Sequence, residues 1–389
     1  MAGIRFGIIG SGFMGGWHAR NITGRPSRDY ALTAVCDADP SRAKALAEEV
    51  GVRWFDSAEA MMSSGLIDAV LIVTPHYWHP IYAIQAARAG LHVLCEKPLA
   101  ATVGPARAMV AECRRRKVVL GAMLQARTRP LMAKMKRIVA SGRLGRIFNV
   151  TMICSNWYRP QSYYDSGDWR GTWEGEGGGV LLNQAPHSLD LFQWIGGMPT
   201  AVTAVLKTRL HKIAVENTAQ VICEYADPDK VGYIYATTAE APGREELTVA
   251  GDLGTLIARG GKLLLGRLAQ PMLEHLRTSD DRYKGPDCRW TELKVADDPM
   301  AGHMAVVRAF ARHSLRGTPL VATGQESLNE LELSNAIYLA GFGDGRCELP
   351  VDADRMERLL GRLVRQHPSR PGGIGQYAQA ARALRKLLK

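Results

Sequence analysis

The hydrophobic and polar positions of residues 1–122 predict short buried strands that alternate with amphipathic helices. Helical spacing appears in segments such as Pro40–Val50, Trp78–Ala89 and Gly104–Arg115. Strands that alternate with helices form right-handed βαβ units, so we expect a doubly wound parallel sheet. Its strands are expected at five apolar runs of strand length, Ile4–Ile9, Ala31–Cys36, Ala69–Val73, His92–Cys95 and Val118–Met123.

The pattern changes after residue 122 in a way that predicts a second domain. A helical segment, Arg129–Ser141, leads into a strand at Arg146–Cys154, and another helix is expected at His187–Trp194. Turn sequences such as Asp-Pro-Asp join the longer runs that follow, which favours antiparallel neighbours in one large sheet. These runs lie at Ala201–Leu210, Ala214–Tyr225, Val231–Thr238, Glu245–Ala250 and Gly254–Arg259, with helices afterwards at Gly302–Leu315 and Gln325–Ala340. The segment 268–290 has no clear period and is expected to be a surface excursion.

The predicted fold class is therefore α/β, with a doubly wound parallel sheet and a second α/β domain on a large open, mostly antiparallel sheet. The length of 389 residues fits two domains at roughly 150 residues each. We place them at 1–122 and 123–352, followed by a basic helical tail at 353–389. Apolar residues make up 46% and charged residues 22% of the chain, a globular balance that excludes wholesale disorder.

Segments for membranes, secretion or cross-linking are not expected. No apolar run approaches the roughly 18–20 residues of a membrane span, and no signal peptide precedes the strand that begins at Ile4. Seven cysteines, odd in number and without a Cys-x-x-Cys pair, argue against a disulfide framework and a zinc site. We therefore expect a soluble cytoplasmic protein.

Most of the net charge of +11 lies in the tail, because the segment from Arg355 onward carries +8 of it. The remaining body is near neutral and has no basic stripe interleaved with aromatic residues, so no nucleic-acid partner is expected. The tail also carries one apolar stripe at helical spacing. We expect the stripe to dock on the body of the protein or on a neighbouring subunit, with a membrane surface as the alternative. Its members are Ile374, Tyr377, Ala381, Leu384 and Leu388.

A glycine motif after the first strand predicts a dinucleotide site in a Rossmann domain. Gly10, Ser11, Gly12, Phe13, Met14 and Gly15 form G-x-G-x-x-G between a strand and a helix. Gly10 permits the tight turn, Gly12 lets a pyrophosphate approach the backbone, and Gly15 allows close packing of helix and strand. Asp37 ends the second strand, where its carboxylate binds ribose hydroxyls and repels a 2′-phosphate, so NAD is favoured over NADP. Arg42 is the counterargument, because a nearby arginine holds such a phosphate.

The ends of the next two strands carry further candidate cofactor residues. Thr74 and Pro75 end one strand, and Glu96 and Lys97 end another; ligands collect at such carboxyl ends. A lysine in this place is able to hydrogen-bond a substrate hydroxyl, stabilise a developing alkoxide and take part in proton transfer. A structural pair between Lys97 and Glu96 is the alternative. We expect His79 to lie beside the cofactor as well.

Taken in order, these motifs resemble the Gfo/Idh/MocA family, named for glucose–fructose oxidoreductase, inositol dehydrogenase and rhizopine-catabolism relatives. The resemblance runs from residue 4 to about 350 and includes the glycines 177–179, the segment 183–187 (Asn-Gln-Ala-Pro-His) and Asp190. It implies an N-terminal Rossmann domain and a C-terminal domain on a large open sheet, with the nicotinamide between them. It also implies a homodimer or homotetramer, since open sheets in this family commonly pack face to face.

The resemblance assigns two catalytic residues by position. Lys97 matches the lysine of the family's Glu-Lys-Pro motif, and His187 matches the histidine that accepts the proton of the substrate hydroxyl. A histidine suits this task because its ordinary pKa near 6.5 lets it cycle at neutral pH. Inositol-dehydrogenase-like members have an aspartate four residues before it, where this chain has Asn183. An amide orients a hydroxyl but does not accept its proton, so proton transfer falls on His187 and Lys97.

An aromatic stretch in the second domain suggests a carbohydrate pocket. Aromatic faces pack on sugar C–H surfaces while arginine and tyrosine tips bond hydroxyls. The stretch resembles family members that act on sugars and glycosides, including levoglucosan dehydrogenase. Tyr164, Trp169 and Arg170 are the predicted pocket residues, with the subunit core or an oligomer interface as the alternative. Gln125, predicted to contact the cofactor, and Arg127 are expected to reach the same cleft.

The predicted function is NAD-dependent oxidation of a secondary hydroxyl of a sugar, glycoside or cyclitol, without a metal, because lysine and histidine handle the proton. Two alternatives keep the fold: redox-neutral glycoside cleavage through transient C3 oxidation with NAD kept bound, and keto-sugar reduction. A third, from another class, is a non-catalytic dinucleotide-binding regulatory protein.

Overall fold

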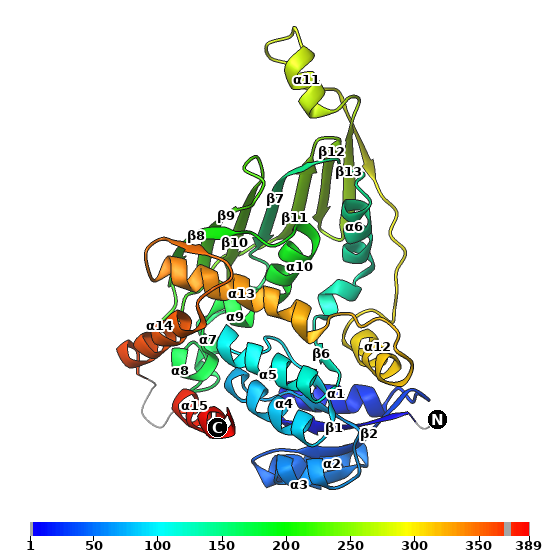
Figure 1. The fold of residues 1–389 in the computed structure, drawn as a ribbon, viewed down its shortest axis with the longest axis vertical. Coiled ribbons are helices and arrows are strands. Elements are labelled where there is room, and N and C mark those ends of the chain that lie inside the picture. Colours follow the sequence, from blue (N-terminus) through cyan, green and yellow to red (C-terminus); the bar gives the residue numbers. More distant parts are fainter. Residues whose placement is uncertain (1–2, 369–374, 389) are drawn as a thin grey trace.

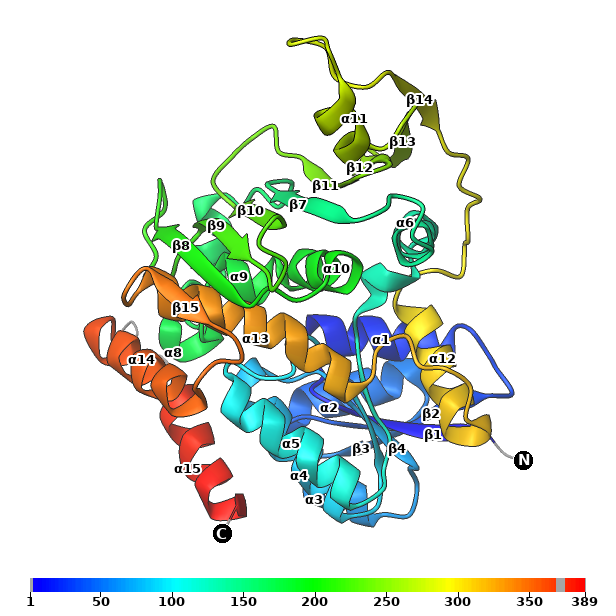
Figure 2. The ribbon, with the colours of Figure 1, turned by 45° about the horizontal axis from the view of Figure 1, so that its top comes forward.

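The computed structural model describes residues 3–368 and 375–388, which form two sheets with helices packed around them. The strands β1 to β6 build the first sheet, in the lower half of Figure 1, and the strands β7 to β15 build the second, in the upper half. Figure 2 shows helices α10 (Pro186–Gly196) and α13 (Gly324–Gly341) lying between the second sheet and the first. The fold is α/β, as predicted.

The first sheet is six-stranded and wholly parallel, with the order β3-β2-β1-β4-β5-β6. The order reverses between β1 and β4, and ligands bind outside the carboxyl ends of strands at such a switch point. The short β3 escaped the sequence analysis because three residues are too few for a hydrophobic period. The strands are β1 (Ile4–Ile9), β2 (Tyr30–Cys36), β3 (Arg53–Phe55), β4 (Ala69–Ile72), β5 (His92–Cys95) and β6 (Leu120–Ala122).

Helices cover both faces of the first sheet, and one of them comes from far along the chain. On one face α3 (Ala58–Ser63), α4 (His79–Arg88) and α5 (Val103–Arg115) share a core with β4 and β5. On the other face α1 (Phe13–Thr23) and α2 (Pro40–Val50) lie with α12 (His303–Arg316). The ring of Phe310 in α12 lies 5.8 Å from that of Phe6 in β1. The division at residue 122 thus separates the two sheets, but the core of the first sheet includes a later helix.

The second sheet is nine-stranded, with the order β14-β13-β12-β11-β7-β10-β9-β8-β15. All neighbours are antiparallel except β7 and β10. Its strands are β7 (Ile147–Cys154), β8 (Ala201–Lys207), β9 (Thr218–Glu224), β10 (Val231–Thr237), β11 (Glu245–Gly251), β12 (Gly254–Arg259), β13 (Lys262–Leu268), β14 (Cys288–Glu292) and β15 (Arg346–Glu348). The edge strand β14 was not predicted because all five of its residues are exposed, which leaves no hydrophobic alternation.

Helices cover one face of the second sheet. They also hold the loops that lie toward the first sheet. The longest, α13, begins with a capping box formed by Thr323 and Glu326. The helix α11 projects at the top of Figure 1 as the predicted surface excursion. The remaining elements are η1 (His76–Trp78), η2 (Gln125–Thr128), α6 (Pro130–Ala140), α7 (Gln161–Asp165), α8 (Trp173–Glu176), α9 (Val180–Asn183), α10 (Pro186–Gly196), α11 (Met272–Thr278), α13 (Gly324–Gly341), α14 (Ala353–Gln366) and α15 (Gln376–Leu388).

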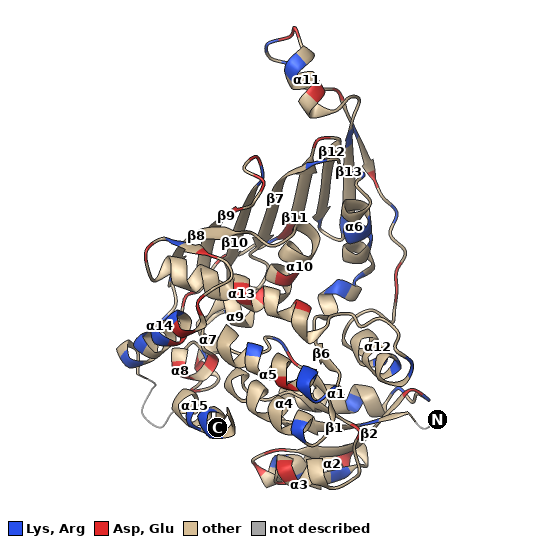
Figure 3. Cartoon of the chain, viewed as in Figure 1, with Lys and Arg blue, Asp and Glu red and all other residues tan. Residues whose placement is uncertain are grey.

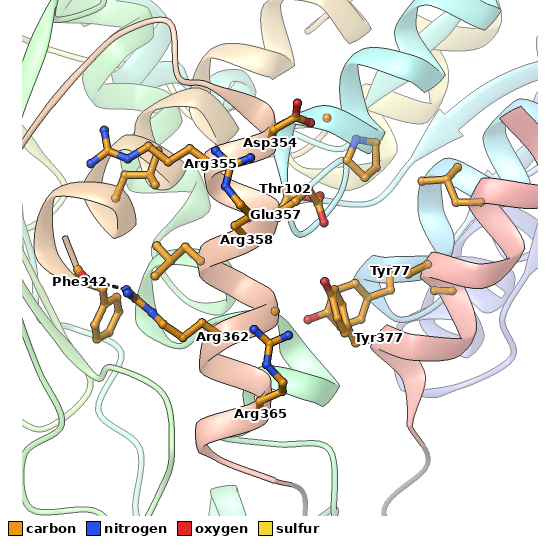
Figure 4. A pocket seen from close by; sticks show the side chains of 18 of the residues that line it. Tyr77, Thr102, Phe342, Asp354, Arg355, Glu357, Arg358, Arg362, Arg365 and Tyr377 are labelled. Carbon is orange, nitrogen blue, oxygen red and sulfur yellow. Dashed lines mark hydrogen bonds between the residues drawn. The ribbon is translucent and has the colours of Figure 1, made fainter.

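The basic tail forms two helices, α14 and α15, and docks on the body of the same chain. Figure 3 shows lysine and arginine gathered on both. Tyr377 of α15 packs edge-on against Tyr77 of η1, with ring centroids 5.5 Å apart, and Ala380 is buried. A cavity of about 990 Å³ remains between the two helices, lined by arginines of α14 and by the Tyr77–Tyr377 pair (Figure 4). Ile374, which begins the predicted stripe, lies outside the described residues.

Candidate active site

The glycine turn after β1 has the shape that a dinucleotide requires. Gly10 has φ +104°, and a Cβ there would lie 2.6 Å from the carbonyl oxygen of Val73. A Cβ on Gly15 would lie 1.8 Å from the carbonyl oxygen of Gly10, so only glycine allows this approach of helix and strand. Gly12 is the N-cap of α1 without a side-chain cap, and the space beside it is open. The free N–H groups of α1 and this space fit a pyrophosphate.

Asp37 lies at the rim of the same turn. Its carboxylate accepts hydrogen bonds from the backbone N–H of Ser11 at 2.7 Å and of Asp39 at 2.9 Å. These bonds fix the carboxylate at the end of β2, where the ribose of a dinucleotide binds. The Nε atom of Arg42, the residue that would favour NADP, lies 3.2 Å from a carboxylate oxygen of Asp39. The turn and its acidic rim therefore fit NAD.

The other predicted cofactor residues differ in how they face the site. Phe13 is 87% exposed and Met14 is half-buried at the start of α1. Thr74 and Pro75 follow β4 and are partly open. His79 is buried, with ring nitrogens 2.7 Å from the carbonyl oxygen of Thr74 and 2.8 Å from that of Pro98. Its ring therefore ties together the two segments that carry cofactor and catalytic residues.

Lys97 follows β5 and points toward the second domain. Its Nζ atom donates a hydrogen bond to the backbone oxygen of Asn183 at 3.0 Å. Burial lowers the pKa of Lys97, while the carboxylates of Glu96, Glu330 and Glu176 oppose that shift. A lysine with a lowered pKa still donates a hydrogen bond at neutral pH and releases a proton more readily than an exposed one.

Glu96 lies behind Lys97 in a buried pair with His18. The Oε1 atom of Glu96 is 2.7 Å from Nε2 of His18. Burial raises the pKa of Glu96, but the hydrogen bond and charge of His18 and the charge of Lys97 outweigh it and lower that pKa to about 2. Glu96 was predicted to contact the cofactor, and this placement gives it a supporting position beneath Lys97.

Asn183 links Lys97 to a second buried carboxylate. Its Nδ2 atom donates a short hydrogen bond to Oε1 of Glu176. Oε2 of Glu176 accepts from the backbone N–H of Gly171 at 2.6 Å. Burial raises the pKa of Glu176 to about 7, opposed by the bond from Gly171. Because the amide nitrogen of Asn183 is engaged with Glu176, its Oδ1 atom is the one available to orient a substrate hydroxyl.

His187 lies in the first turn of α10 and contacts Gln125. The Nε2 atom of His187 and the amide nitrogen of Gln125 are 3.0 Å apart. Neither Nδ1 of His187 nor Oε1 of Gln125 has a partner within the described residues, although both atoms are buried. Burial and the positive charge of Lys97 lower the pKa of His187 to about 3. The imidazole is therefore neutral at neutral pH, with one ring nitrogen that carries a hydrogen and one that accepts a hydrogen bond.

The expectation that Arg127 reaches the cleft is wrong, because its guanidinium is buried against Asp190. Nε and Nη2 of Arg127 bind the two carboxylate oxygens of Asp190 at 2.8 and 2.7 Å. The pair joins η2, which carries Gln125, to α10, which carries His187. Arg127 therefore contributes to the site indirectly, because it holds η2 and α10 in place.

The aromatic stretch between β7 and α8 has Tyr163 rather than Tyr164 beside Arg170. The hydroxyl of Tyr164 is buried and bonds Thr238 at 2.7 Å, so the direct role in a pocket predicted for Tyr164 finds no support in this geometry. The hydroxyl of Tyr163 accepts a hydrogen bond from Arg170 at 2.7 Å. Trp169 is 39% exposed, and the guanidinium of Arg170 lies 4.3 Å from its ring centroid.

Two buried carboxyl groups near Lys97 were not predicted from the sequence. Glu176 and Glu330 were not singled out, and burial raises the pKa of both. Oε1 of Glu330 is buried without a partner among the described residues. A glutamate inside a glycine-rich or helical segment gives no sequence signal, because its burial depends on elements far apart in the chain.

Two further findings concern metals and membranes. Among residues 3–368 and 375–388, no three or more His, Cys, Asp or Glu side chains are grouped so that they could hold a metal ion. Within that same part of the chain, no helix has the length and apolar character needed to cross a membrane.

Family models match both domains. The model described as "Oxidoreductase family, NAD-binding Rossmann fold" matches residues 4–123. The model described as "GFO/IDH/MocA C-terminal domain" matches residues 132–257. Together they cover the first sheet and most of the second.

Curated relatives and a solved structure agree with these models. Inositol 2-dehydrogenase of Rhizobium meliloti is 29% identical, over 86% of this chain and 95% of that protein. Levoglucosan dehydrogenase of Pseudarthrobacter phenanthrenivorans is 31% identical, over 54% of this chain and 55% of that protein. The chain thus spans about half the length of several curated relatives that it matches.

The solved WlbA dehydrogenase from Bordetella pertussis, in complex with NADH and UDP-GlcNAcA, is 31% identical with a TM-score of 0.75. That match covers 90% of this chain and 100% of the other. The glycine turn, the lysine after β5 and the two matched domains lead to one conclusion: this chain belongs to the Gfo/Idh/MocA family of NAD-binding oxidoreductases.

Proposed function

We propose that the protein oxidises a secondary hydroxyl of a sugar, glycoside or cyclitol, with NAD as the hydride acceptor. The observation that carries the proposal is the approach of Lys97 to the segment 183–187. Lys97 comes from the first sheet, bonds Asn183 at 3.0 Å, and lies close enough to His187 to lower its pKa. A lysine and a neutral histidine are thereby gathered beyond the end of β5, next to the dinucleotide turn.

The side chains divide the work of a dehydrogenation. NAD supplies the hydride acceptor when it is bound. His187, whose imidazole is neutral, is assigned the proton of the hydroxyl, and Lys97 stabilises the oxygen as negative charge develops there. Asn183, with its amide nitrogen held by Glu176, presents Oδ1 to orient the substrate. The absence of a carboxylate at position 183 leaves His187 and Lys97 to handle the proton.

The substrate class follows from the aromatic stretch together with the relatives. Trp169 and Arg170 offer a ring face and hydrogen-bond donors, a combination that suits a pyranose. Relatives of this chain are named for inositol and levoglucosan, and a solved neighbour holds a nucleotide-linked sugar. We propose a carbohydrate with a ring rather than an open-chain alcohol.

The experiment that tests the proposal is absorbance at the NADH band with NAD and a panel of pyranosides, glycosides and inositols. An increase with at least one ring compound supports the proposal, and its identity sets the class. If NAD is shown to bind and no compound of the panel changes the absorbance, net oxidation is contradicted. In that case NAD that stays bound through purification, with release of an aglycone, indicates the redox-neutral reaction, and consumption of NADH with keto-sugars indicates a reductase.

We propose further that two copies associate through the uncovered face of the second sheet. Ile222 of β9 is 57% exposed there, and Val205 of β8 and Val231 of β10 are also exposed. Burial of such side chains between subunits is favourable by about 25 cal/mol per Å² of apolar surface. Light scattering of the wild type and Ile222→Glu tests this, since a charge on the face is expected to yield monomers. A monomeric wild type contradicts it.

A further inference from the structure

Two arginines and three aromatic rings form an alternating stack in the stretch between β7 and α8. The guanidinium of Arg170 lies 4.3 Å from the ring centroid of Trp169 and 4.5 Å from that of Tyr163. The guanidinium of Arg159 lies 4.8 Å from Tyr163 and 5.5 Å from Trp157. The two positive charges therefore share one ring, that of Tyr163. Cation–π contacts hold both planes in fixed orientations.

Among the described residues, neither arginine of this stack forms an ion pair with a carboxylate. The ion pairs formed within the described residues include neither Arg159 nor Arg170, whereas Arg127, Arg129 and Arg146 nearby in sequence each have a carboxylate partner. Two neighbouring guanidiniums that are not ion-paired repel each other, and an anion that binds both relieves that repulsion.

The guanidiniums of the stack also have N–H donors that are not used in hydrogen bonds within the described residues. The Nε atom of Arg159 is buried and has no partner within the described residues. One Nη atom of Arg159 donates to the backbone oxygen of Tyr158 at 3.1 Å, and one Nη atom of Arg170 donates to the hydroxyl of Tyr163 at 2.7 Å. A guanidinium has five N–H donors in a planar fork that matches carboxylate and phosphate oxygens.

Contacts lead from this stack to the catalytic residues. The hydroxyl of Tyr163 accepts a hydrogen bond from Gln184 at 3.3 Å, and Gln184 is the residue after Asn183. The charge of Arg170 acts on Glu176, the carboxylate that holds the amide of Asn183. The stack thus lies one side chain away from the group that orients the substrate hydroxyl.

We propose that Arg159 and Arg170 bind an anionic substituent of the substrate, a carboxylate or a phosphate on the sugar, while its secondary hydroxyl lies at Lys97 and His187. The inference rests on the proposed function and narrows it from carbohydrates in general to acidic carbohydrates. The ring of Tyr163 lies between the two guanidiniums and fixes the distance between them. Trp169 supplies a partly exposed ring face for the sugar. The anionic group and the reacting carbon are then bound by different segments.

The test compares three probes that share the glucopyranose ring: methyl glucuronoside, methyl glucoside and glucose 1-phosphate. Binding of each to the NADH complex is measured by calorimetry, and kcat/KM is measured for each that reacts. We expect an acidic probe to bind at least tenfold more tightly than methyl glucoside, because charge-assisted bonds to two arginines are present only with the anion. Whether the uronoside or the phosphate binds more tightly identifies the source of the anion.

Substitutions of the two arginines test whether they cause the preference for an acidic probe. Arg170→Met and Arg159→Met are each expected to reduce the preference for the acidic probe by about 10-fold or more. Arg170→Lys keeps the charge without the fork and is expected to lose part of that preference. Arg282→Met, on the exposed loop after α11, is the matched control and leaves the preference unchanged. Equal binding of acidic and neutral probes by the wild type overturns the inference, as does a preference that survives in both Met variants.

The calorimetric arm separates this inference from the proposed function. An acidic probe that binds through Arg170 without any change at the NADH band supports the anion site while contradicting net oxidation of that probe. Oxidation of methyl glucoside with no preference for an acidic probe supports the proposed function and overturns the anion site.

Discussion

Arg127 and Asp190 form a bidentate ion pair that is almost wholly buried, with 2% and 1% of the two side chains exposed. The guanidinium contacts both carboxylate oxygens, at 2.8 and 2.7 Å. Asp190 lies one helical turn after His187 on α10, and Arg127 lies two residues after Gln125 on η2. The ion pair therefore holds η2 and α10 together and so fixes the distance between Gln125 and His187.

Asp190→Asn is expected to destabilise the protein by about 3 kcal/mol. The substitution removes the buried partner of Arg127 and leaves only the half-exposed carboxylate of Glu326, 3.8 Å away, to compensate its charge. It is also expected to lower kcat through displacement of His187. Urea unfolding measures the first effect and steady-state kinetics the second. Asp297→Asn, at an exposed site, is the control and should change stability by less than about 0.5 kcal/mol. An unfolding midpoint for Asp190→Asn equal to the wild type would show that the pair contributes no net stability.

Lys97→Ala is expected to lower kcat by about 10²–10⁴-fold while the Kd for NADH stays within about tenfold of the wild type. The lysine is assigned to the substrate oxygen, so its removal affects the transition state more than the cofactor. Single-turnover kinetics and a fluorescence titration with NADH measure the two quantities. If the losses in binding and in rate are equal, Lys97 is a cofactor anchor.

Glu176→Gln is expected to move the alkaline limb of kcat/KM to lower pH, by roughly 1 pH unit. Glu176 has a pKa of about 7 and is therefore charged at alkaline pH, where it raises the pKa of Lys97 against the effect of burial. Removal of that charge lets Lys97 lose its proton sooner. Glutamine keeps an oxygen for the bond from Asn183.

A pH–rate profile of Glu176→Gln beside the control Glu274→Gln, on the distant helix α11, measures this shift. An alkaline limb at the wild-type position in both variants would mean that Glu176 does not act on Lys97.

Asp37→Asn is expected to raise the Kd for NADH by about tenfold and to reduce the discrimination against NADPH. An amide supplies one acceptor where the carboxylate supplies two, and those two already serve Ser11 and Asp39. It also removes the charge that repels a 2′-phosphate. Fluorescence titrations with both cofactors check the prediction. Unchanged selectivity would place the discrimination elsewhere, with Arg42 the next residue to substitute.

Phe310→Ala is expected to destabilise the protein by about 3–5 kcal/mol, since the ring is fully buried against Phe6 and the first sheet. Tyr283→Ala is the control, because that ring is 96% exposed. Thermal and urea unfolding measure both. A small loss for Phe310→Ala would indicate that α12 contributes little to the core of the first sheet.

Features encoded in local pattern were predictable from the sequence, and features created by tertiary packing were not. Five of the six parallel strands were predicted from mainly apolar runs, and the turn at Gly10 follows one of them, so the sequence predicted both the fold class and the cofactor. The placement of Arg127 did not, because its partner Asp190 lies 63 residues away. Tyr163 and Tyr164 are adjacent in sequence, and only the path of the chain decides which of them faces Arg170.

The packing of α12 on the first sheet has a consequence for the order in which the protein is made. Ribosomal synthesis completes all six parallel strands by Ala122, but the helix that covers Phe6 begins only at His303. Part of one apolar face of the N-terminal core therefore stays uncovered while eight of the nine strands of the second sheet, β7 to β14, are synthesised. The core of the first sheet is therefore completed only after α12, which ends at Arg316, has been synthesised.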